Sequence, residues 1–522
     1  MIDGRIINYI LSIASGIESI GEVIAGTNKE KQVIEIIKKN LEDHVDELWI
    51  EHVPVTSWRE EVCVVETTNG SYPCAIHPPY QGVIDEEVGY DKIISMDLDK
   101  LENKGITKID ISDKIILIDI PRDPDDIATV AYILSRYSPR LIVIRDRGES
   151  LRRIVVLDNV VALYREARQL NIPVVHVGRG IGMIDKLVGS RIYAKSMRFK
   201  SYGYNFIAKL HKRYDKYIYI TAHHDHWLSG GSDNIIGISI IIALSEILKD
   251  INIDNGIVLA SFTAEEGFPE NITSFYWLVG SRYHINRHVN ELVDNTALAI
   301  NIDVVYKEPL VASTPSTIVR NMITSYSKDI LLEYDDIIFD SFSFSSIGIP
   351  SVTFNTFKKT LEEGVYHSNR DFVYNISTEV VWHTIKSIYL LINNYMASIR
   401  NNEFINVYNI NVDVQSILQR VLPSELLLNI YRVHKMFNKL RERLERPKCM
   451  YFINLFNRII NTSYVDRDIG KKLGIREGTD LIKCNENIIP LPIGTEFKNS
   501  SECYRNINFN LELLAYILFK YY

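Results

Sequence analysis

Residues 217–226 read Tyr-Ile-Tyr-Ile-Thr-Ala-His-His-Asp-His, an apolar run that ends in histidines and an aspartate. The run predicts a strand at Tyr217–Thr221, with the polar residues at its carboxyl end. Beyond them comes Gly231-Ser232-Asp233-Asn234, and the stretch Ile235–Leu248 is then apolar on most helical faces, which predicts a buried helix. A strand, a polar loop and a buried helix in this order predict one unit of a parallel α/β sheet.

The same pattern repeats between residues 203 and 400. Strands alternating with helices are typical of a sheet that is covered by helices on both sides. We therefore expect an α/β fold with a mostly parallel central sheet and helices on both faces. The predicted strands are Asn205–Leu210, Tyr217–Thr221, Gly256–Phe262, Leu298–Asp303 and Pro350–Phe354.

The pattern changes elsewhere along the chain, and the length of 522 residues exceeds what one core usually serves. Helices are expected at Ile6–Ile17, whose apolar spacing fits an amphipathic helix better than a signal peptide, and at Lys29–Asp43. A strand follows at Leu48–Val55. We expect four segments: 1–57 with the first helices and strand of the main domain, 58–200 as a small α/β insert, 201–400 as the main domain, and 401–522 as a mainly helical C-terminal region.

The insert is expected to contain alternating strands and helices and to bind no cofactor. Its glycine-rich stretch, 178–182, lacks the GxGxxG spacing of a dinucleotide site. A glycine turn that opens a helix is the better interpretation. The expected strands are Lys114–Ile120, Leu141–Ile144 and Pro173–Val177, and the expected helices are Ile127–Arg136 and Leu157–Gln169.

Bulk composition narrows the class of protein. The net charge of −8 disfavours nucleic acid and anionic membranes as partners. No apolar run is expected to be long enough to span a membrane. The cysteines number five and are scattered, with no CxxC pair. That suits a reducing, cytoplasmic location with no disulfide framework and no cysteine zinc site.

Acidic and imidazole side chains follow the predicted strands at their carboxyl ends, where ligands bind in open α/β sheets. Several carboxylates crowded at one edge repel one another unless cations neutralise them. Carboxylate and imidazole together suit zinc, with Co²⁺ or Mn²⁺ as substitutes. Each motif alone is weak evidence, and their common placement is what counts. The residues are His223, Asp225, Asp233, Glu265, Glu266, Asp303 and His367.

The segment 203–375 resembles the M28 family of zinc metallopeptidases. The matching stretches, in order, are Asn205-Phe206-Ile207-Ala208, His223-x-Asp225, Ser232-Asp233-Asn234-Ile235-Ile236-Gly237, Glu265-Glu266-Gly267, Gly280-Ser281, Asn301-Ile302-Asp303, Phe344-x-x-x-Gly348-Ile349-Pro350 and Tyr366-His367-x-x-x-Asp371. The insert is similar, more loosely, to the protease-associated domain of many members.

The resemblance implies a role for each residue. Asp233 would bridge two Zn²⁺ ions, with His223 and Asp303 completing one site and Glu266 and His367 the other. Glu265 would be the general base. Asp225 would accept a hydrogen bond from His223 and fix its tautomer. The implied activity is that of an aminopeptidase that hydrolyses peptide substrates, and by analogy the C-terminal region would serve a homodimer.

Some features leave alternatives open. The chain reads Asp340-Ser341-Phe342 where members often have Ser-Asp-His, which affects pocket shape. His224 and His226 would either contact the substrate or have an accessory role, or else be packed or exposed side chains without a part in the reaction. Carboxypeptidase activity would need a basic cluster, for which Arg282 or Arg370 is available. A single-zinc aminoacyl cyclase and a non-catalytic receptor or scaffold are further alternatives. The aromatic residues of the next loop would line a pocket or pack locally: Phe268, Phe275, Tyr276 and Trp277.

Overall fold

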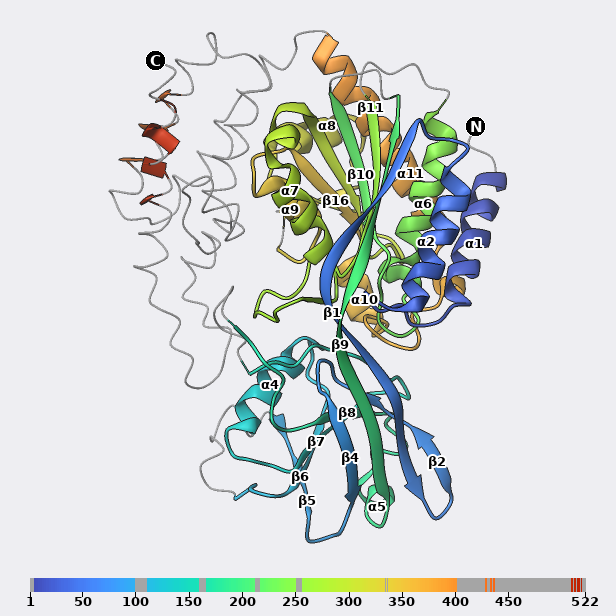
Figure 1. The fold of residues 1–522 in the computed structure, drawn as a ribbon, viewed down its shortest axis with the longest axis vertical. Helices are drawn as coiled ribbons and strands as arrows, with labels where there is room; N and C mark the ends of the chain where they lie inside the picture. The colour runs from blue at the N-terminus through green and yellow to red at the C-terminus, as the bar shows by residue number, and fades with distance from the viewer. Residues whose placement is uncertain are drawn as a thin grey trace.

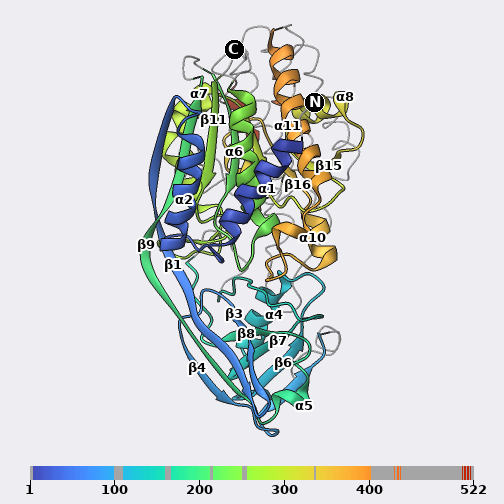
Figure 2. The same ribbon diagram turned by 90° about the vertical axis from the view of Figure 1, so that its right-hand side faces the viewer.

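The protein is described by a computed structural model, in which a large sheet with its helices stands above a smaller lobe (Figures 1 and 2). The described residues are 4–98, 110–158, 166–211, 216–249, 256–333, 335 and 337–400, with single residues between 428 and 518. The segment 401–522, for which a mainly helical structure and a role in a homodimer are predicted, lies almost entirely outside the described residues.

The large sheet has 11 strands and is mixed, with a parallel centre. Strands β11 (Gly256–Phe262), β10 (Tyr217–His223), β13 (Thr296–Ile302) and β16 (Ser351–Asn355) pair in parallel in that order. Their residues are nearly all buried, as expected for strands covered on both faces. The α/β prediction is confirmed, while the strands outside this centre are mostly antiparallel.

Antiparallel strands extend the sheet on both sides of the parallel centre. On one side β9 (Arg191–Leu210) pairs with β11, and β1 (Glu47–Thr67) pairs with β9. The remaining strands of this sheet are β2 (Gly70–Pro73), β4 (Gly82–Glu87), β12 (Phe268–Pro269), β14 (Val311–Ser313) and β15 (Leu331–Glu333).

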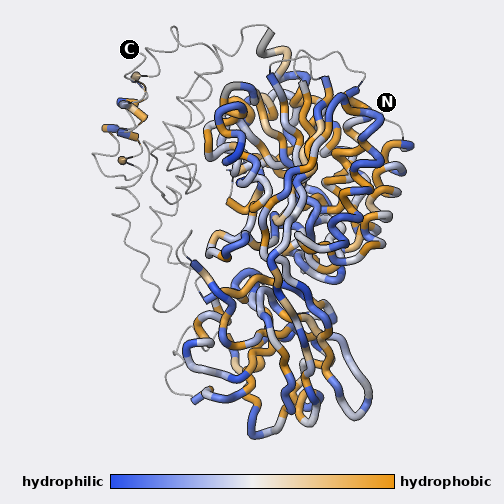
Figure 3. The backbone as a smooth tube through the Cα atoms, in the orientation of Figure 1, coloured by the Kyte–Doolittle hydropathy of each residue, from blue (hydrophilic) through white to orange (hydrophobic). Residues whose placement is uncertain are grey.

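Helices cover both faces of the large sheet (Figure 1). The most buried is α6 (Ile236–Leu248), whose apolar side chains belong to the main core. Figure 3 shows hydrophobic segments throughout the strands and helices of the large sheet. Beside α6 lie α1 (Gly4–Glu18), α2 (Asn28–Leu41) and α11 (Thr378–Arg400), and the other face carries α7 (Val279–Asn295) and α9 (Ser341–Ser345). Shorter elements are α8 (Thr317–Tyr326), α10 (Phe357–Glu363) and η3 (Val373–Asn375).

The stretch Gly231–Leu248 is long and apolar enough to cross a membrane by length and composition, yet 89% of it is buried inside the protein. Its hydropathy is therefore accounted for by the core that it forms with the sheet and its neighbouring helices.

The smaller lobe holds a second sheet, in the order β3-β8-β7-β6-β5. Strands β1 and β9 run from the large sheet down into this lobe as one long antiparallel ribbon, paired from Glu47↔Lys209 to Glu66↔Arg191 (Figure 1). The predicted boundaries at 58 and 200 fall inside this ribbon, and the division into domains stays a prediction. The lobe's elements are β3 (Ala75–Ile76), β5 (Ile93–Met96), β6 (Ile115–Asp119), α4 (Asp126–Ser135), β7 (Leu141–Arg145), β8 (Val174–Val177) and α5 (Ile184–Leu187).

Two predictions about the insert are wrong. The expected helix Leu157–Gln169 is not formed at its ends, because Leu157 and Gln169 pair in an antiparallel bridge. A disulfide joins Cys63 to Cys74, with the sulfur atoms 1.96 Å apart. The absence of disulfides was inferred from scattered cysteines, but the β1–β2 hairpin brings these two opposite each other. The cytoplasmic location stays a prediction; disulfides do occur in intracellular proteins of hyperthermophiles.

Candidate metal centre and cavity

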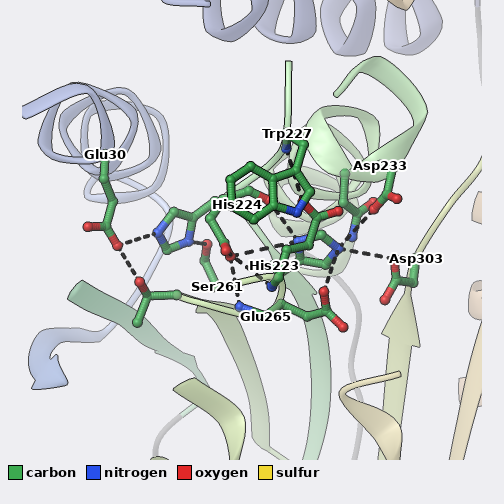
Figure 4. A network of polar contacts seen from close by, with 12 residues as sticks. Glu30, His223, His224, Trp227, Asp233, Ser261, Glu265 and Asp303 are labelled. Carbon is green, nitrogen blue, oxygen red and sulfur yellow. Dashed lines mark hydrogen bonds and ion pairs between the residues drawn. The ribbon is translucent and has the colours of Figure 1, made fainter. Parts of the chain in front are cut away.

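The first histidine of the strand-end motif is surrounded by carboxylates. His223 closes β10 and is fully buried. Its Nε2 lies 3.1 Å from Asp303 Oδ1 and 3.3 Å from Asp233 Oδ1. Glu265 Oε2 is 3.9 Å from the same nitrogen. Figure 4 shows the His223 ring facing all of these carboxylates, which come from separate strands and loops.

A second cluster shares Asp233 with the first. The other oxygen of Asp233, Oδ2, lies 3.5 Å from His367 Nε2. Glu266 Oε1 lies 2.9 Å from that same nitrogen. The potential ligand atoms within each cluster of three residues all lie within 4.8 Å of one another. Asp233 thus presents one carboxylate oxygen to each histidine, and five of the predicted residues converge at one place.

The turn that carries Asp233 is held from behind by Asp371. This buried carboxylate accepts hydrogen bonds from the backbone N–H of Ser232 at 3.0 Å and of Asp233 at 3.2 Å. It also accepts from the Ser232 hydroxyl at 2.7 Å. The turn Gly231–Ile235 departs from helical geometry at Asp233, and these bonds satisfy N–H groups that a regular helix start would expose.

Asp225 acts differently from the prediction. Its carboxylate is 3.9 Å from His223 Nδ1, whereas its backbone carbonyl oxygen is at 2.9 Å and is the acceptor for that ring. Because a carbonyl can only accept, the proton sits on Nδ1 and Nε2 faces the cluster. The Asp225 carboxylate instead accepts from the backbone N–H of Glu265 at 2.9 Å and of Glu266 at 3.2 Å. It therefore positions the loop of the predicted base.

Backbone strain gathers around the same residues. Ala264, which precedes Glu265, has φ of 50°, Val304, which follows Asp303, has 52°, and His367 itself has 50°. Non-glycine residues in this left-handed region are uncommon and are held there by their surroundings, often at functional sites. The strain supports a functional role for the three loops.

Burial and like charge shift the titration of the cluster. Burial raises the pKa of Glu265 well above its usual range and that of Glu266 to about 8. Burial opposes protonation of His367, but Glu266 and Asp233 raise its pKa to about 10. Without cations, Glu265, Glu266 and His367 must therefore hold protons, which reduce the negative charge of the cluster.

The donor set fits a pair of divalent cations. Glu266 and Asp303 each use one carboxylate oxygen to accept a hydrogen bond and present the other oxygen to a histidine. Glu266 Oε2 accepts from the Trp227 N–H at 3.0 Å, and Asp303 Oδ2 accepts from the Asn301 amide at 3.4 Å. Glu266 Oε1 is buried and accepts no hydrogen bond from any described residue, although His367 Nε2 is 2.9 Å away. Imidazole nitrogens and carboxylate oxygens converging in this way are the ligands that zinc prefers.

The cluster opens into a cavity of about 350 Å³. Aromatic residues from the large domain and a stretch of the insert form its walls, and Asp125 at the start of α4 adds a further carboxylate. Among the described residues that line it, none is lysine or arginine. Of the aromatic residues considered from sequence, Tyr276 and Trp277 line the cavity, whereas Phe268 and Phe275 are buried.

The insert also holds the loop that carries His367, a contact that sequence analysis missed. Arg152 donates to the Tyr366 carbonyl at 2.6 Å and to the Gly364 carbonyl, and its Nε lies 2.8 Å from Asp146 Oδ2. Arg153 N–H donates to the His367 carbonyl at 3.1 Å. More than 200 residues separate the partners, so no local pattern predicts the contact.

The flanking residues lie away from the cavity. His224 is buried, with Nδ1 2.7 Å from Ser261 Oγ and Nε2 3.2 Å from Glu30 (Figure 4). His226 is buried too, and burial lowers its pKa to about 4. Arg282 donates to the carbonyls of Phe275 and Trp277 and, like Arg370, does not line the cavity.

Comparison with known proteins agrees with this geometry. Residues 205–392 match the model of Peptidase family M28. No curated protein matches the chain. A zinc aminopeptidase from Bacillus subtilis is 18% identical with a TM-score of 0.55, and the match covers 74% of this chain and 94% of that one. An M28 peptidase precursor from Shewanella amazonensis is 18% identical with a TM-score of 0.56, covering 75% and 93%. At such identities the likeness establishes a shared fold.

Proposed function

Residues 205–392 belong to peptidase family M28, and from that premise we propose that this chain is a two-zinc aminopeptidase that removes N-terminal residues from peptides. One observation carries the proposal. Asp233 directs one oxygen at each of two histidines, and each histidine has a carboxylate of its own. Two cations sharing a bridging carboxylate are the usual solution to that arrangement.

The ligands divide between two positions. His223 and Asp303 would hold one zinc ion, Glu266 and His367 the other, and Asp233 would contact both. Bound zinc would supply Lewis acidity toward the scissile carbonyl and would lower the pKa of the attacking water. The fold contributes rigid placement, since Asp371 and Asp225 hold the backbone of two of the ligand loops.

Glu265 is the proton carrier in this proposal. It lines the cavity next to the ligands, and its backbone is anchored by the Asp225 carboxylate. Burial raises the pKa of Glu265 well above its usual range. A carboxylate with a raised pKa is a stronger base and takes a proton from water more readily. Glu265 accepts the proton of the attacking water and passes it to the leaving amine.

The charge of the cavity favours an amino terminus over a carboxyl terminus. A carboxypeptidase needs a cation to hold the substrate carboxylate. None of the described residues that line the cavity is lysine or arginine, and Arg282 and Arg370 lie elsewhere. The walls instead present carboxylates, including Asp125 from the insert, which attract the ammonium group of a peptide.

The replacement Glu265→Gln tests the proposal. The variant should keep the zinc content of the parent and lose about 10²- to 10⁴-fold in the rate of hydrolysis of aminoacyl nitroanilides. Glu270→Gln is the matched control, because Glu270 is an exposed acid a few residues on, paired with Lys200. Chelation should abolish activity and zinc should restore it.

Three outcomes would contradict the proposal. Undiminished hydrolysis by Glu265→Gln would remove Glu265 as the base. Faster cleavage of N-acetylated peptides from their carboxyl ends would favour a carboxypeptidase. Full activity with one zinc ion per chain would favour the cyclase alternative.

A further inference from the structure

A second group of ligand-type residues lies outside the cavity, where α7 packs against β1. Glu51 of β1 faces His284 and His288, which lie one turn apart on α7. Glu51 and His284 have side chains only 4% and 2% exposed, and His288 is 28% exposed. None of the three lines the cavity or takes part in the proposed reaction.

The distances match those of the catalytic cluster. His284 Nδ1 lies 3.1 and 3.0 Å from the two oxygens of Glu51. His288 Nε2 lies 2.7 Å from Glu51 Oε1. The three potential ligand atoms lie within 4.8 Å of one another, as they do in both halves of the catalytic cluster. Two imidazoles and one carboxylate form a common zinc ligand set.

The far nitrogen of each histidine also faces an acceptor. The hydroxyl of Tyr219 is 3.5 Å from His284 Nε2, and Glu291 Oε2 is 4.0 Å from His288 Nδ1. When a cation takes the place of the protons between the near nitrogens and Glu51, these outer oxygens face the far nitrogens that then carry the ring protons.

The cluster is linked to the loop of the predicted base through Asn205. The Asn205 amide donates to Glu51 Oε2 at 3.1 Å and to the Gly280 carbonyl at 3.0 Å. Its carbonyl oxygen accepts from Thr263 N–H at 3.1 Å. The start of α7 is bonded to the same loop, with Leu278 N–H donating to the Glu265 carbonyl at 2.8 Å.

We propose that Glu51, His284 and His288 bind a further divalent cation of the zinc class, separate from the catalytic pair, which ties α7 to β1. Solvent reaches the site on the side of His288 and supplies the remaining coordination. Through Asn205 and the first turn of α7, the bound cation restrains the loop that carries Glu265. The proposal goes beyond the catalytic function and does not depend on it.

Zinc content tests the proposal. The full chain, stripped with a chelator, reloaded with Zn²⁺ and desalted, is compared with His288→Ala by elemental mass spectrometry. His288→Ala should hold one zinc ion fewer per chain than the parent. His52→Ala is the matched control, because His52 is an exposed histidine next to Glu51 that lies outside the cluster, and it should lose none. Since the result is a difference, it does not depend on the catalytic stoichiometry.

Glu51→Gln serves as a second variant that preserves side-chain size and should also lose one zinc ion. Equal zinc in the parent and in both cluster variants would overturn the proposal and leave an ordinary hydrogen-bonded cluster. If neither variant folds, zinc-loaded crystals of the parent decide the matter. An anomalous peak between Glu51, His284 and His288 supports the site, and its absence overturns it.

Discussion

Replacing Asp371 tests how the fold holds the shared carboxylate. This buried side chain satisfies the backbone N–H groups of Ser232 and Asp233 and the Ser232 hydroxyl. Asp371→Ala leaves all of these donors buried without an acceptor. An unsatisfied buried donor costs about 1–3 kcal/mol, so the free energy of unfolding should fall by about 3–5 kcal/mol, allowing for partial relaxation.

The conservative change Asp371→Asn should behave differently. If its NH₂ group takes the place of Oδ1, the Ser232 hydroxyl can rotate to accept from it, and the remaining oxygen still accepts from both backbone N–H groups. Only the charge on the acceptor is lost, and a neutral hydrogen bond is about half as strong as a charged one. We expect a loss of about 1 kcal/mol in stability.

Metal affinity should follow the same order. Residues that orient a ligand typically contribute about 10- to 100-fold to affinity, so zinc should bind Asp371→Ala that much more weakly and Asp371→Asn nearly as well as the parent. Denaturant unfolding gives the stability, and competition with a chromogenic chelator gives the affinity. If Asp371→Ala matches the parent in both, the turn does not depend on Asp371 and the reasoning fails.

Three further predictions concern the charges around the centre. In the metal-free chain, the pKa values of about 10 for His367 and about 8 for Glu266 mean that the folded state holds protons that the unfolded state releases. Its free energy of unfolding should therefore fall as pH rises from 7 to 10, whereas the zinc-loaded chain should show little change; parallel slopes would contradict this. Arg152→Met leaves Asp146 buried with one partner fewer and should lower the free energy of unfolding by about 3–5 kcal/mol in denaturant titrations, with a smaller loss for Arg152→Lys. Asp125→Asn should raise KM for aminoacyl substrates about fivefold at unchanged kcat, and an unchanged KM would remove Asp125 from substrate binding.

The sequence predicted the strand ends well because chemistry and periodicity coincide there. The apolar run into His223 and the buried helix after Asp233 each have one reasonable interpretation, and parallel strands bring their carboxyl ends together. The positions of His223, Asp233 and Asp303 follow from that topology alone.

Contacts between segments that are distant in the chain could not be predicted from the sequence. Arg152 meets the loop of His367 only because the β1–β9 ribbon places the insert beside it, and no spacing in the sequence encodes that contact. The disulfide could be predicted only in part: Asn69-Gly70 indicates a hairpin, but a turn at those two residues would set Cys63 opposite Ile76. The observed pairing of Thr67 with Gly70 is what brings Cys63 opposite Cys74. Asp225 was assigned to His223 through its carboxylate, but the tight turn brings the carbonyl oxygen closer.

Anomalous diffraction at the zinc edge, from crystals of the zinc-loaded chain, would locate the cations relative to Asp233. We expect two peaks beside Asp233, one reached by His223 and Asp303 and the other by Glu266 and His367. A single peak, or none within reach of these side chains, would contradict this expectation.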